Sequence, residues 1–533
     1  MKKILAIFLL CGMVLSLCAC PGGDGGHTGD NGERSDGVWR DSIGEYETET
    51  GKEYNFGGDS LSISCRNDYV YEIYAEAGST ESIDPMVYAR NKRIEDRFNV
   101  KVKPVITVCK GIDDQLTHYE EVANAIKTNN VKFDLVSMWA YQSGKIILSG
   151  GYLDWRMNDG KGNFMVPFAG ESIVNGAEWW PTSMNNPSSV LGCQYVAISD
   201  MCLTSYESAY AVVYNYDKVT NEGIPSRLGY VDMYDIVNKG DWTLTMMNDI
   251  VKDMHQESTT GGVEGKDVTD TFGLLISQAT SIDAFIHSLG YNVLNNNGVD
   301  MPQLWNVDGN MVTTIEHLRA MCNSKGAWIG NGMTVTEYDQ FFTEGHAYFA
   351  SMKLERLRTS VLHAMEDDYG ILPYPKLDKG QKEYITGSDD HYNVLSIPLD
   401  MIGRTEIIGV VIEALSAETG NTANDEKGRS LEGVFINEMI KVNSTRFVQD
   451  EDMVDKILNG RVYDLVTYHH ADLLIDQTNA SNHLHAFFRV LVNNPDKEVR
   501  NYWDTGEQIL NGDENTPGSV LYLINRYINM YNQ

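Results

Sequence analysis

The chain has 533 residues, with 75 acidic against 42 basic side chains and a formal net charge of −33 at pH 7. A surface this acidic repels nucleic acid and anionic lipid headgroups, which argues against both as binding partners, and it is compatible with a neutral ligand. The length is sufficient for two large lobes.

The N-terminus predicts export. Lys2 and Lys3 precede an apolar run that ends in Leu-Cys-Ala-Cys at Cys20. A basic head and an apolar stretch of this length predict a signal peptide over residues 1–19 rather than a spanning helix. The ending resembles a bacterial lipobox, which predicts lipidation of Cys20; the alternative is a plain signal peptide with an incidental cysteine.

A glycine-rich, polar run follows Cys20, so residues 20–56 are predicted to form a flexible tether. This order of parts predicts a protein on the extracellular face of a Gram-positive type cell membrane, held there by its lipid alone. Beyond the tether the chain has five cysteines, an odd number, and none of them is spaced as C-x-x-C. Buried free thiols are therefore expected, although Cys193 and Cys202 could pair across a hairpin. No cofactor and no metal site is expected.

Strand and helix patterns then alternate along the chain, which predicts an α/β fold with a largely parallel first sheet. Helical faces are predicted at Val87 to Phe98, at Leu116 to Ile126 and after a cap at Asp241 or Thr243. Further helices are predicted over 407–417 and 519–531. The predicted strands are 61–65, 100–108, 133–139, 194–198, 211–215, 272–276, 347–351, 369–372 and 394–397.

Six segments in this order resemble those of the extracellular solute-binding proteins (family 1) of bacterial ABC-type carbohydrate importers, the group that includes maltose-binding protein. The similar segments are 133–144 with 151–154, 210–217 with 223–225, 241–243, 341–352, 369–375 and 446–468. Two positions depart from the family pattern. Phe349 stands where the family usually has methionine, and Arg66-Asn67-Asp68 at the exit of the first strand is not a strict match.

The resemblance implies a periplasmic-binding-protein type II-like fold, with two α/β lobes that hinge over a ligand cleft. By analogy, lobe 1 comprises 57–165 and 369–440, and lobe 2 comprises 166–368 and 441–533. The implied protein is a monomer and not an enzyme. It captures a carbohydrate, in particular an oligosaccharide, and presents it to ABC-transporter permease subunits.

A sugar site needs aromatic planes for the apolar ring faces and carboxylates, amides or basic groups for the hydroxyls. Residues of these types fall in loops or at positions that the family uses for ligand contact. The candidates are Arg66, Asp68, Trp139, Tyr141, Gln142, Trp180, Trp305, Trp328, Lys353, Glu355, Asp390 and Tyr392. For each of them the alternative is packing in the core or anchoring of a loop.

Two other functions stay open. A secreted glycoside hydrolase would need two carboxylates about 5 to 10 Å apart in unequal environments, and the adjacent acids of 366–368 and 389–390 match this only loosely. A binding protein for a peptide or another solute would share the same fold. The sequence has no G-x-S-x-G, H-E-x-x-H or P-loop pattern.

Overall fold

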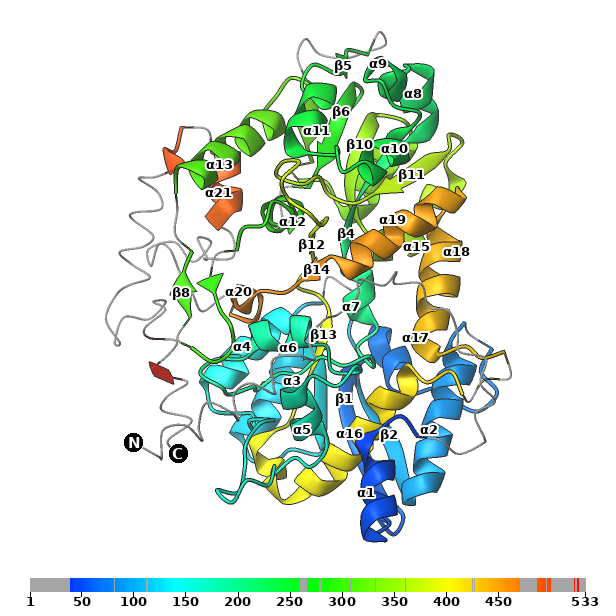
Figure 1. The fold of residues 1–533 in the computed structure, drawn as a ribbon, viewed down its shortest axis with the longest axis vertical. Helices are drawn as coiled ribbons and strands as arrows, with labels where there is room; N and C mark the ends of the chain where they lie inside the picture. The colour runs from blue at the N-terminus through cyan, green and yellow to red at the C-terminus, as the bar shows by residue number, and fades with distance from the viewer. Residues whose placement is uncertain are drawn as a thin grey trace, which may run out of the picture. The chain divides into compact units, whose positions relative to one another are not determined.

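Two β-sheets organise the part of the chain that the structure describes (Figure 1). The structure is a computed structural model, and it describes residues 39–469, 487–499 and 522–526. Short gaps within these ranges lie at 81, 112–113, 259–265, 278–279, 293, 301, 306–307, 331, 360, 424, 426, 495 and 523–524. Cys20, residues 20–38 of the predicted tether and nearly all of the predicted helix 519–531 lie outside the described residues. The tether predicted over 20–56 is too long, because Ser42–Thr50 form a helix with Ile43 buried, and Asp41 pairs with Arg97 at 2.7 Å.

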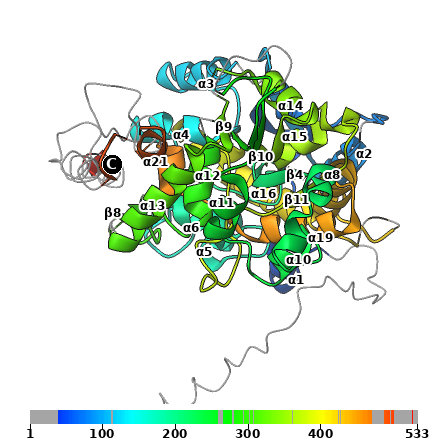
Figure 2. The same cartoon turned by 90° about the horizontal axis from the view of Figure 1, so that it is seen from above.

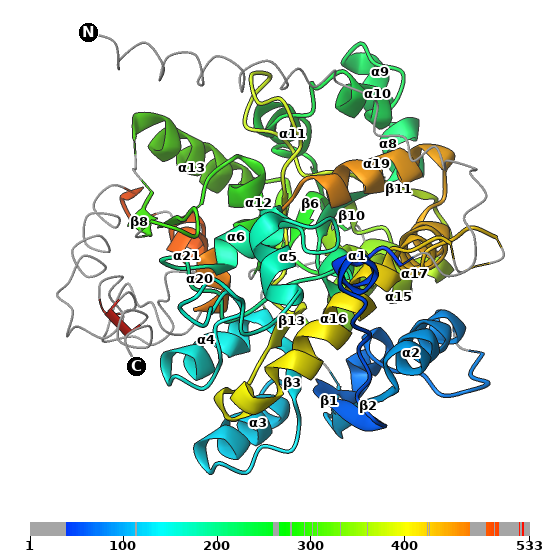
Figure 3. The ribbon, with the colours of Figure 1, turned by 60° about the horizontal axis from the view of Figure 1, so that its bottom comes forward.

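The first sheet has the strand order β13-β3-β1-β2. Its strands are β1 (Asp59–Arg66), β2 (Val100–Thr107), β3 (Leu135–Trp139) and β13 (Asn393–Ser396). β1 runs parallel to β2 and β3, and β13 runs antiparallel to β3. Helices α2 (Asp84–Phe98) and α3 (Thr117–Lys127) form the connections between the parallel strands (Figure 3). The strand–helix–strand pattern predicted for this part of the chain is confirmed.

The second sheet has the order β11-β4-β10-β6-β5, with β9 paired to β6. Its strands are β4 (Tyr210–Asn215), β5 (His255–Gln256), β6 (Thr271–Ile276), β9 (Ala327–Ile329), β10 (Ala347–Lys353) and β11 (Tyr369–Leu372). All six residues of β4 are buried, as expected for a central strand covered on both faces. β11 pairs with β4 in this sheet, although the expected lobe border grouped residue 369 onward with the first sheet.

Helices surround both sheets, as the views in Figures 1 and 2 show. Those not yet given, up to residue 251, are α1 (Ser42–Thr50), α4 (Ala140–Leu148), α5 (Ala169–Asn175), α6 (Thr182–Ser188), α7 (Thr204–Glu207), α8 (Tyr216–Asn221), α9 (Ile224–Arg227), α10 (Met233–Asn238) and α11 (Leu244–Val251). The later ones are α12 (Thr280–Ser288), α13 (Gly309–Cys322), α14 (Val335–Thr343), α15 (Leu354–Thr359), α16 (Thr405–Thr419), α17 (Leu431–Val434), α18 (Val442–Ser444), α19 (Val448–Asn459), α20 (Leu465–Tyr468) and α21 (Phe487–Asn493). Thr243 caps α11, because its side chain accepts a hydrogen bond from the amide of Met246.

The chain passes from one sheet to the other more than once. It leaves the first sheet region through α7 to enter β4, and it returns along residues 373–392 to enter β13. Two short strands, β12 (Thr386–Gly387) and β14 (Arg461–Val462), pair with each other in parallel, and Ala209 forms a bridge with Ser388. The passages are therefore held to one another by backbone hydrogen bonds.

One predicted strand is wrong. Residues 194–198 form only an isolated bridge, between Ala197 and Leu395. Side chains take the place of a strand partner here, because the amide of Gln194 donates to Asp154 and the amide of Ile198 donates to Asn185. Because side chains accept the hydrogen bonds of these backbone amides, the segment does not need to pair with a neighbouring strand.

Helix α16 is the buried helix that the sequence predicts over 407–417, and it packs against β1, α2 and α5. Gly409 lies where α16 comes close to the backbone of Pro167. A Cβ at this position would stand 2.3 Å from the carbonyl oxygen of Pro167. A main-chain atom cannot be displaced as easily as a flexible side chain, so the position requires glycine.

We expect Gly409→Ala to lower the free energy of unfolding by about 1–3 kcal/mol, because overpacking outweighs the gain in helix propensity. Gly403→Ala is the matched control, since a Cβ at Gly403 meets no atom within 4 Å. Chemical denaturation of both variants measures the difference. Equal or greater stability of Gly409→Ala would show that the helix can shift freely.

Candidate functional site

Charged and aromatic side chains from both sheets meet where several strands end. Arg66 ends β1, Trp139 ends β3, and Lys353 ends β10 in the other sheet. The carboxyl ends of parallel strands share one edge of a sheet, which is where open α/β sheets bind ligands. We call this group the aromatic–ionic cluster, and its members are Arg66, Asp68, Trp139, Tyr141, Lys353, Glu355, Asp389, Asp390 and His391.

Trp139 is the centre of the cluster and is fully buried. The guanidinium carbon of Arg66 lies 3.9 Å from the centroid of the Trp139 ring, and the ring of Tyr141 stacks at 6.0 Å. The edge of the His391 ring approaches at 4.6 Å. Trp139 therefore holds its neighbours in place, while Tyr141 and His391 are only partly buried.

Arg66 is fixed by four hydrogen bonds. Its Nε and one terminal nitrogen donate to the two carboxylate oxygens of Asp68, at 2.9 and 2.8 Å. The terminal nitrogens also donate to the carbonyl oxygens of Asp114, at 2.7 Å, and Gly111, at 3.0 Å. This bidentate pair orients the carboxylate of Asp68, whose side chain keeps 26% of its surface exposed.

Gln142 lies beside Tyr141, since its Nε2 is 3.2 Å from the Tyr141 hydroxyl oxygen and also donates to the carbonyl of Gln115. Both residues belong to the first turn of α4, which begins directly after β3. The sharp change from strand to helix therefore brings the Tyr141 ring next to Trp139.

A network of charges links this region to the second sheet. Nδ1 of His391 lies 2.5 Å from a carboxylate oxygen of Asp389 and 2.7 Å from one of Asp390. The ammonium of Lys353 lies 3.7 Å from Asp389 and 3.1 Å from Glu355. The Tyr210 hydroxyl at the start of β4 donates to Asp389 at 3.1 Å. The residues of the returning passage thus contact strands of both sheets.

The pKa values follow from this pairing. Burial disfavours the charged forms of His391 and Asp389, but their partners outweigh it. The two carboxylates raise the pKa of His391 to about 10, and Lys353 and His391 together lower the pKa of Asp389 below its usual range. At neutral pH Asp389 is therefore a carboxylate and His391 an imidazolium.

Asp389, Asp390 and His391 could in principle hold a metal ion, since one ligand atom from each lies within 4.8 Å of the others. Nδ1 of His391, the ring atom nearest to the acids, lies 2.5 Å from Asp389 and 2.7 Å from Asp390 and so already pairs with both carboxylates. The two cationic side chains already supply the positive charge that the carboxylates require. The chemistry of the group thus fits an ion-pair network rather than a metal site.

Sequence reasoning missed several side chains here. The predicted site contains Asp390 but not its two neighbours, Asp389 and His391. Glu207, at the end of α7, is buried and accepts hydrogen bonds from the Tyr71 hydroxyl, at 2.9 Å, and from Nε of Arg358, at 2.6 Å. Burial raises the pKa of Glu207. The sequence signal that could have identified Glu207 is its position just before β4, where the chain enters the second sheet.

Four of the predicted residues lie apart from the cluster. Trp180 is fully buried, and its Nε1 donates to Glu413 of α16 at 2.8 Å. Trp328 packs between Phe272 and Phe341, and Trp305 packs on Tyr291. Tyr392 is buried, with its hydroxyl 3.2 Å from that of Tyr468. These contacts match the alternative of core packing or loop anchoring.

No family model matches the chain, and no curated protein matches it in sequence. In structure it is similar to a sugar transporter from Rhizobium etli in an open conformation. The TM-score is 0.50 and the identity 12%, over 84% of this chain and 98% of that chain. It is also similar to UgpB from Mycobacterium tuberculosis in complex with glycerophosphocholine. The TM-score is again 0.50 and the identity 11%, over 88% of this chain and 99% of that chain.

At such identities the similarity establishes the fold. The chain has a mixed α/β, periplasmic-binding-protein type II-like fold, which confirms the predicted fold class. Among the described residues, no helix has both the length and the apolar character to cross a bilayer.

Proposed function

We propose that this chain is an extracellular solute-binding protein that captures a carbohydrate, in particular an oligosaccharide, and presents it to the permease subunits of an ABC importer. The observation that carries the proposal is the set of partly buried groups that follow strand ends of two separate sheets: the Tyr141 ring, which stacks on Trp139, the Asp68 carboxylate, which is paired with Arg66, and the Glu355 carboxylate, which is paired with Lys353. A flat apolar plane with flanking carboxylates is what a pyranose ring and its hydroxyls require.

Each part of the cluster has a role in this proposal. The apolar face of a sugar stacks on Tyr141, and its hydroxyls donate to Asp68 and Glu355. Lys353 donates to a ring or hydroxyl oxygen while it neutralises the acids around it. Arg66 and Trp139 are buried and act as positioning residues, because they fix the carboxylate and the ring that touch the ligand.

The two sheets form the cores of two lobes in this proposal. Since β11 pairs with β4, the border of the second lobe lies after Leu372 rather than before Tyr369. The passages near Ala209 and Ser388 then act as a hinge, and closing it brings Lys353 and Glu355 onto a ligand held by Tyr141. Cys20 and the glycine-rich segment up to residue 38 would anchor this body to the outer face of the membrane.

A thermal-shift panel tests the proposal. It contains mono- and oligosaccharides, amino acids, short peptides, metal ions and glycerophosphocholine, the last because the similar protein UgpB was solved with it. We expect the largest rise in melting temperature with a neutral oligosaccharide. A rise with amino acids or metal ions alone would refute the carbohydrate assignment. Release of shorter sugars during incubation would show a glycoside hydrolase instead.

The variant Tyr141→Ala should weaken binding of the sugar found in this panel about tenfold or more, because stacking and apolar burial on one ring contribute about 1.5–3 kcal/mol. Tyr141→Phe keeps the ring and should retain most of the affinity. Tyr88→Ala, an exposed tyrosine on α2, is the matched control. Titration calorimetry measures all three, and unchanged affinity in Tyr141→Ala would exclude this ring from the site.

A further inference from the structure

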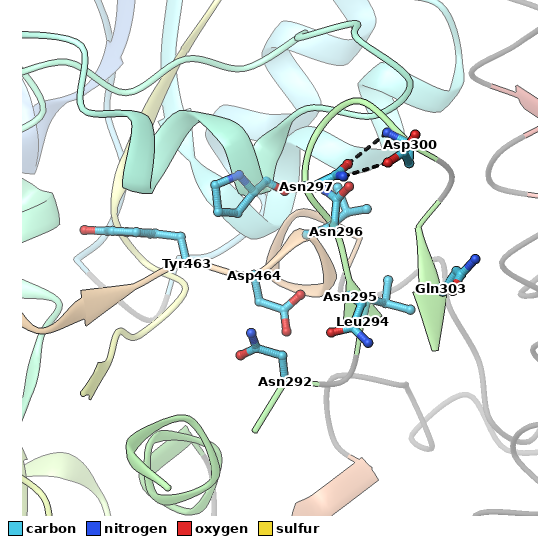
Figure 4. Close-up of a pocket in the computed structure, with 11 residues that line it drawn as sticks. Asn292, Leu294, Asn295, Asn296, Asn297, Asp300, Gln303, Tyr463 and Asp464 are labelled. Atoms are coloured by element: carbon cyan, nitrogen blue, oxygen red, sulfur yellow. Dashed lines mark hydrogen bonds between the residues drawn. The ribbon is translucent and has the colours of Figure 1, made fainter. Parts of the chain in front are cut away.

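A polar pocket of about 640 Å³ lies apart from the aromatic–ionic cluster (Figure 4). Its lining comes from three separate parts of the chain. These are the hairpin of β7 (Leu294–Asn295) and β8 (Gln303–Leu304) with the loop between them, Pro187 in α6, and residues 463–465 at the start of α20. We call it the asparagine pocket. A volume of this size is typical of small-molecule sites.

The pocket and the cluster are joined by one segment. His391 contacts Trp139 in the cluster, while the next residue, Tyr392, packs on Tyr463 with ring centroids 5.1 Å apart. Tyr463 lines the pocket. The two sites are thus distinct and share the passage that returns to the first sheet.

Two amides build the wall of the pocket. Nδ2 of Asn296 donates to the carbonyl oxygens of Pro187, at 2.9 Å, and Ser189, at 2.8 Å, which ties the hairpin loop to the end of α6. The side-chain oxygen of Asn297 accepts from the amides of Val299 and Asp300, and its Nδ2 donates to the Asp300 carboxylate at 2.8 Å. These side chains hold the loop in shape before any ligand arrives.

Other polar groups of the lining are available to a ligand. Asn295 and Gln303 face each other as a cross-strand pair, both are exposed, and neither side chain has a hydrogen-bond partner among the described residues. The side-chain oxygen of Asn292 accepts a hydrogen bond from Nδ1 of His287 at 2.9 Å. The side-chain NH₂ group of Asn292 can therefore donate to a ligand. Figure 4 shows Asn292 and Asp464 pointing into the same space, where one carboxylate oxygen of Asp464 already accepts from the amide of Val466 at 3.0 Å. The pocket therefore offers both donors and acceptors.

The charge of the lining limits the class of ligand. Asp300 and Asp464 contribute carboxylates, and the described lining residues include no lysine or arginine. A phosphate or carboxylate ligand would be repelled, whereas hydroxyl groups can donate to the acids and exchange hydrogen bonds with the amides. Leu294 and Leu465 supply a small apolar floor.

We propose that the asparagine pocket is a second binding site, which takes a neutral, hydroxyl-rich saccharide through amide and carboxylate hydrogen bonds rather than through aromatic stacking. The choice of a saccharide rests on the proposed function. The existence and polarity of the site rest on the pocket itself.

Hydrogen exchange with defined probes tests this inference. The probes are maltotetraose, cellotetraose and xylotetraose, each added up to millimolar concentration, with tetragalacturonate as the acidic counterpart. We expect at least one neutral tetrasaccharide to slow exchange in the β7–β8 hairpin and at residues 463–465, and the acidic one to leave these segments unchanged. The double variant Asn295→Ala/Gln303→Ala should weaken this binding about tenfold, the effect of two lost hydrogen bonds.

The control is Asn310→Ala/Gln340→Ala, which removes two exposed amides on α13 and α14, outside the pocket lining. It should bind like the parent chain. Protection confined to residues 66–68 and 139–142 would overturn the second site and leave the proposed function intact. Absence of protection in the hairpin with every neutral probe also overturns the second site, and the separate thermal-shift panel then decides the proposed function.

Discussion

Replacing Lys353 with methionine should lower the free energy of unfolding by about 3–5 kcal/mol, because removal of one partner leaves buried charges uncompensated. The Lys353 ammonium lies 3.1 Å from Glu355 and 3.7 Å from Asp389, whose side chain is 7% exposed. Without it, Asp389 would keep the His391 imidazolium but lose the ammonium beside it. Urea denaturation of the parent chain and the variant measures the loss.

An exposed pair provides the control for this variant. Lys252 lies 2.7 Å from Asp249, with 43% and 55% of the two side chains exposed. Water and salt screen such a pair, so Lys252→Met should change the free energy of unfolding by about 0–1 kcal/mol. If the two variants were equally stable, the network around Asp389 would be no stronger than a surface contact.

Stability should also fall as the pH rises from neutrality towards 10. The pKa of His391 in the folded chain is about 10, against about 6.5 when unfolded. Below the unfolded value both states are protonated, and the stabilisation by Asp389 and Asp390 is fully present. Above it the unfolded chain loses its proton first, so this stabilisation declines and is lost as the pH passes the folded value.

The variant His391→Asn isolates this effect. It should be less stable than the parent chain near pH 6, by an amount on the order of 2–4 kcal/mol. The gap should shrink steadily as the pH rises towards 10, because a growing share of the parent chain then carries a neutral imidazole, about half of it at pH 10. Groups common to both proteins, such as the titrating lysines and tyrosines, cancel in the comparison. A gap that stayed constant with pH would show that His391 is not held as an imidazolium.

Much of the fold was predictable because strands and helices leave periodic patterns. The position just past the first strand pointed to Arg66, whereas Trp139 and Lys353 came from the family resemblance, which implied ligand contacts after their strands. The prediction failed where a partner distant in sequence decides the outcome. Leu116 was expected on the buried face of α3, yet it is 58% exposed, and the helix buries His118 and Val122 instead.

In the candidate site, too, residue types were predictable from the sequence, whereas contacts between distant parts of the chain were not. The sequence shows that Trp180 is large and aromatic, but not that Glu413, more than two hundred residues later, accepts its Nε1 hydrogen bond within the core. In the same way, the neighbouring sequence does not show that the His391 ring contacts Trp139, or that Glu207 accepts a hydrogen bond from Arg358. Residue type was informative about chemistry, and only tertiary packing separated accessible rings from buried ones.

The cysteines have a consequence for how the protein reaches its working form. Cys65, Cys109, Cys193, Cys202 and Cys322 are all buried and unbonded, as the sequence predicted. Burial raises the pKa of Cys65 and of Cys193 to about 12, which keeps them from the thiolate form that oxidants attack. This part of the chain then requires no oxidase or disulfide shuffling to fold, and a reducing cytosol should yield the same folded body.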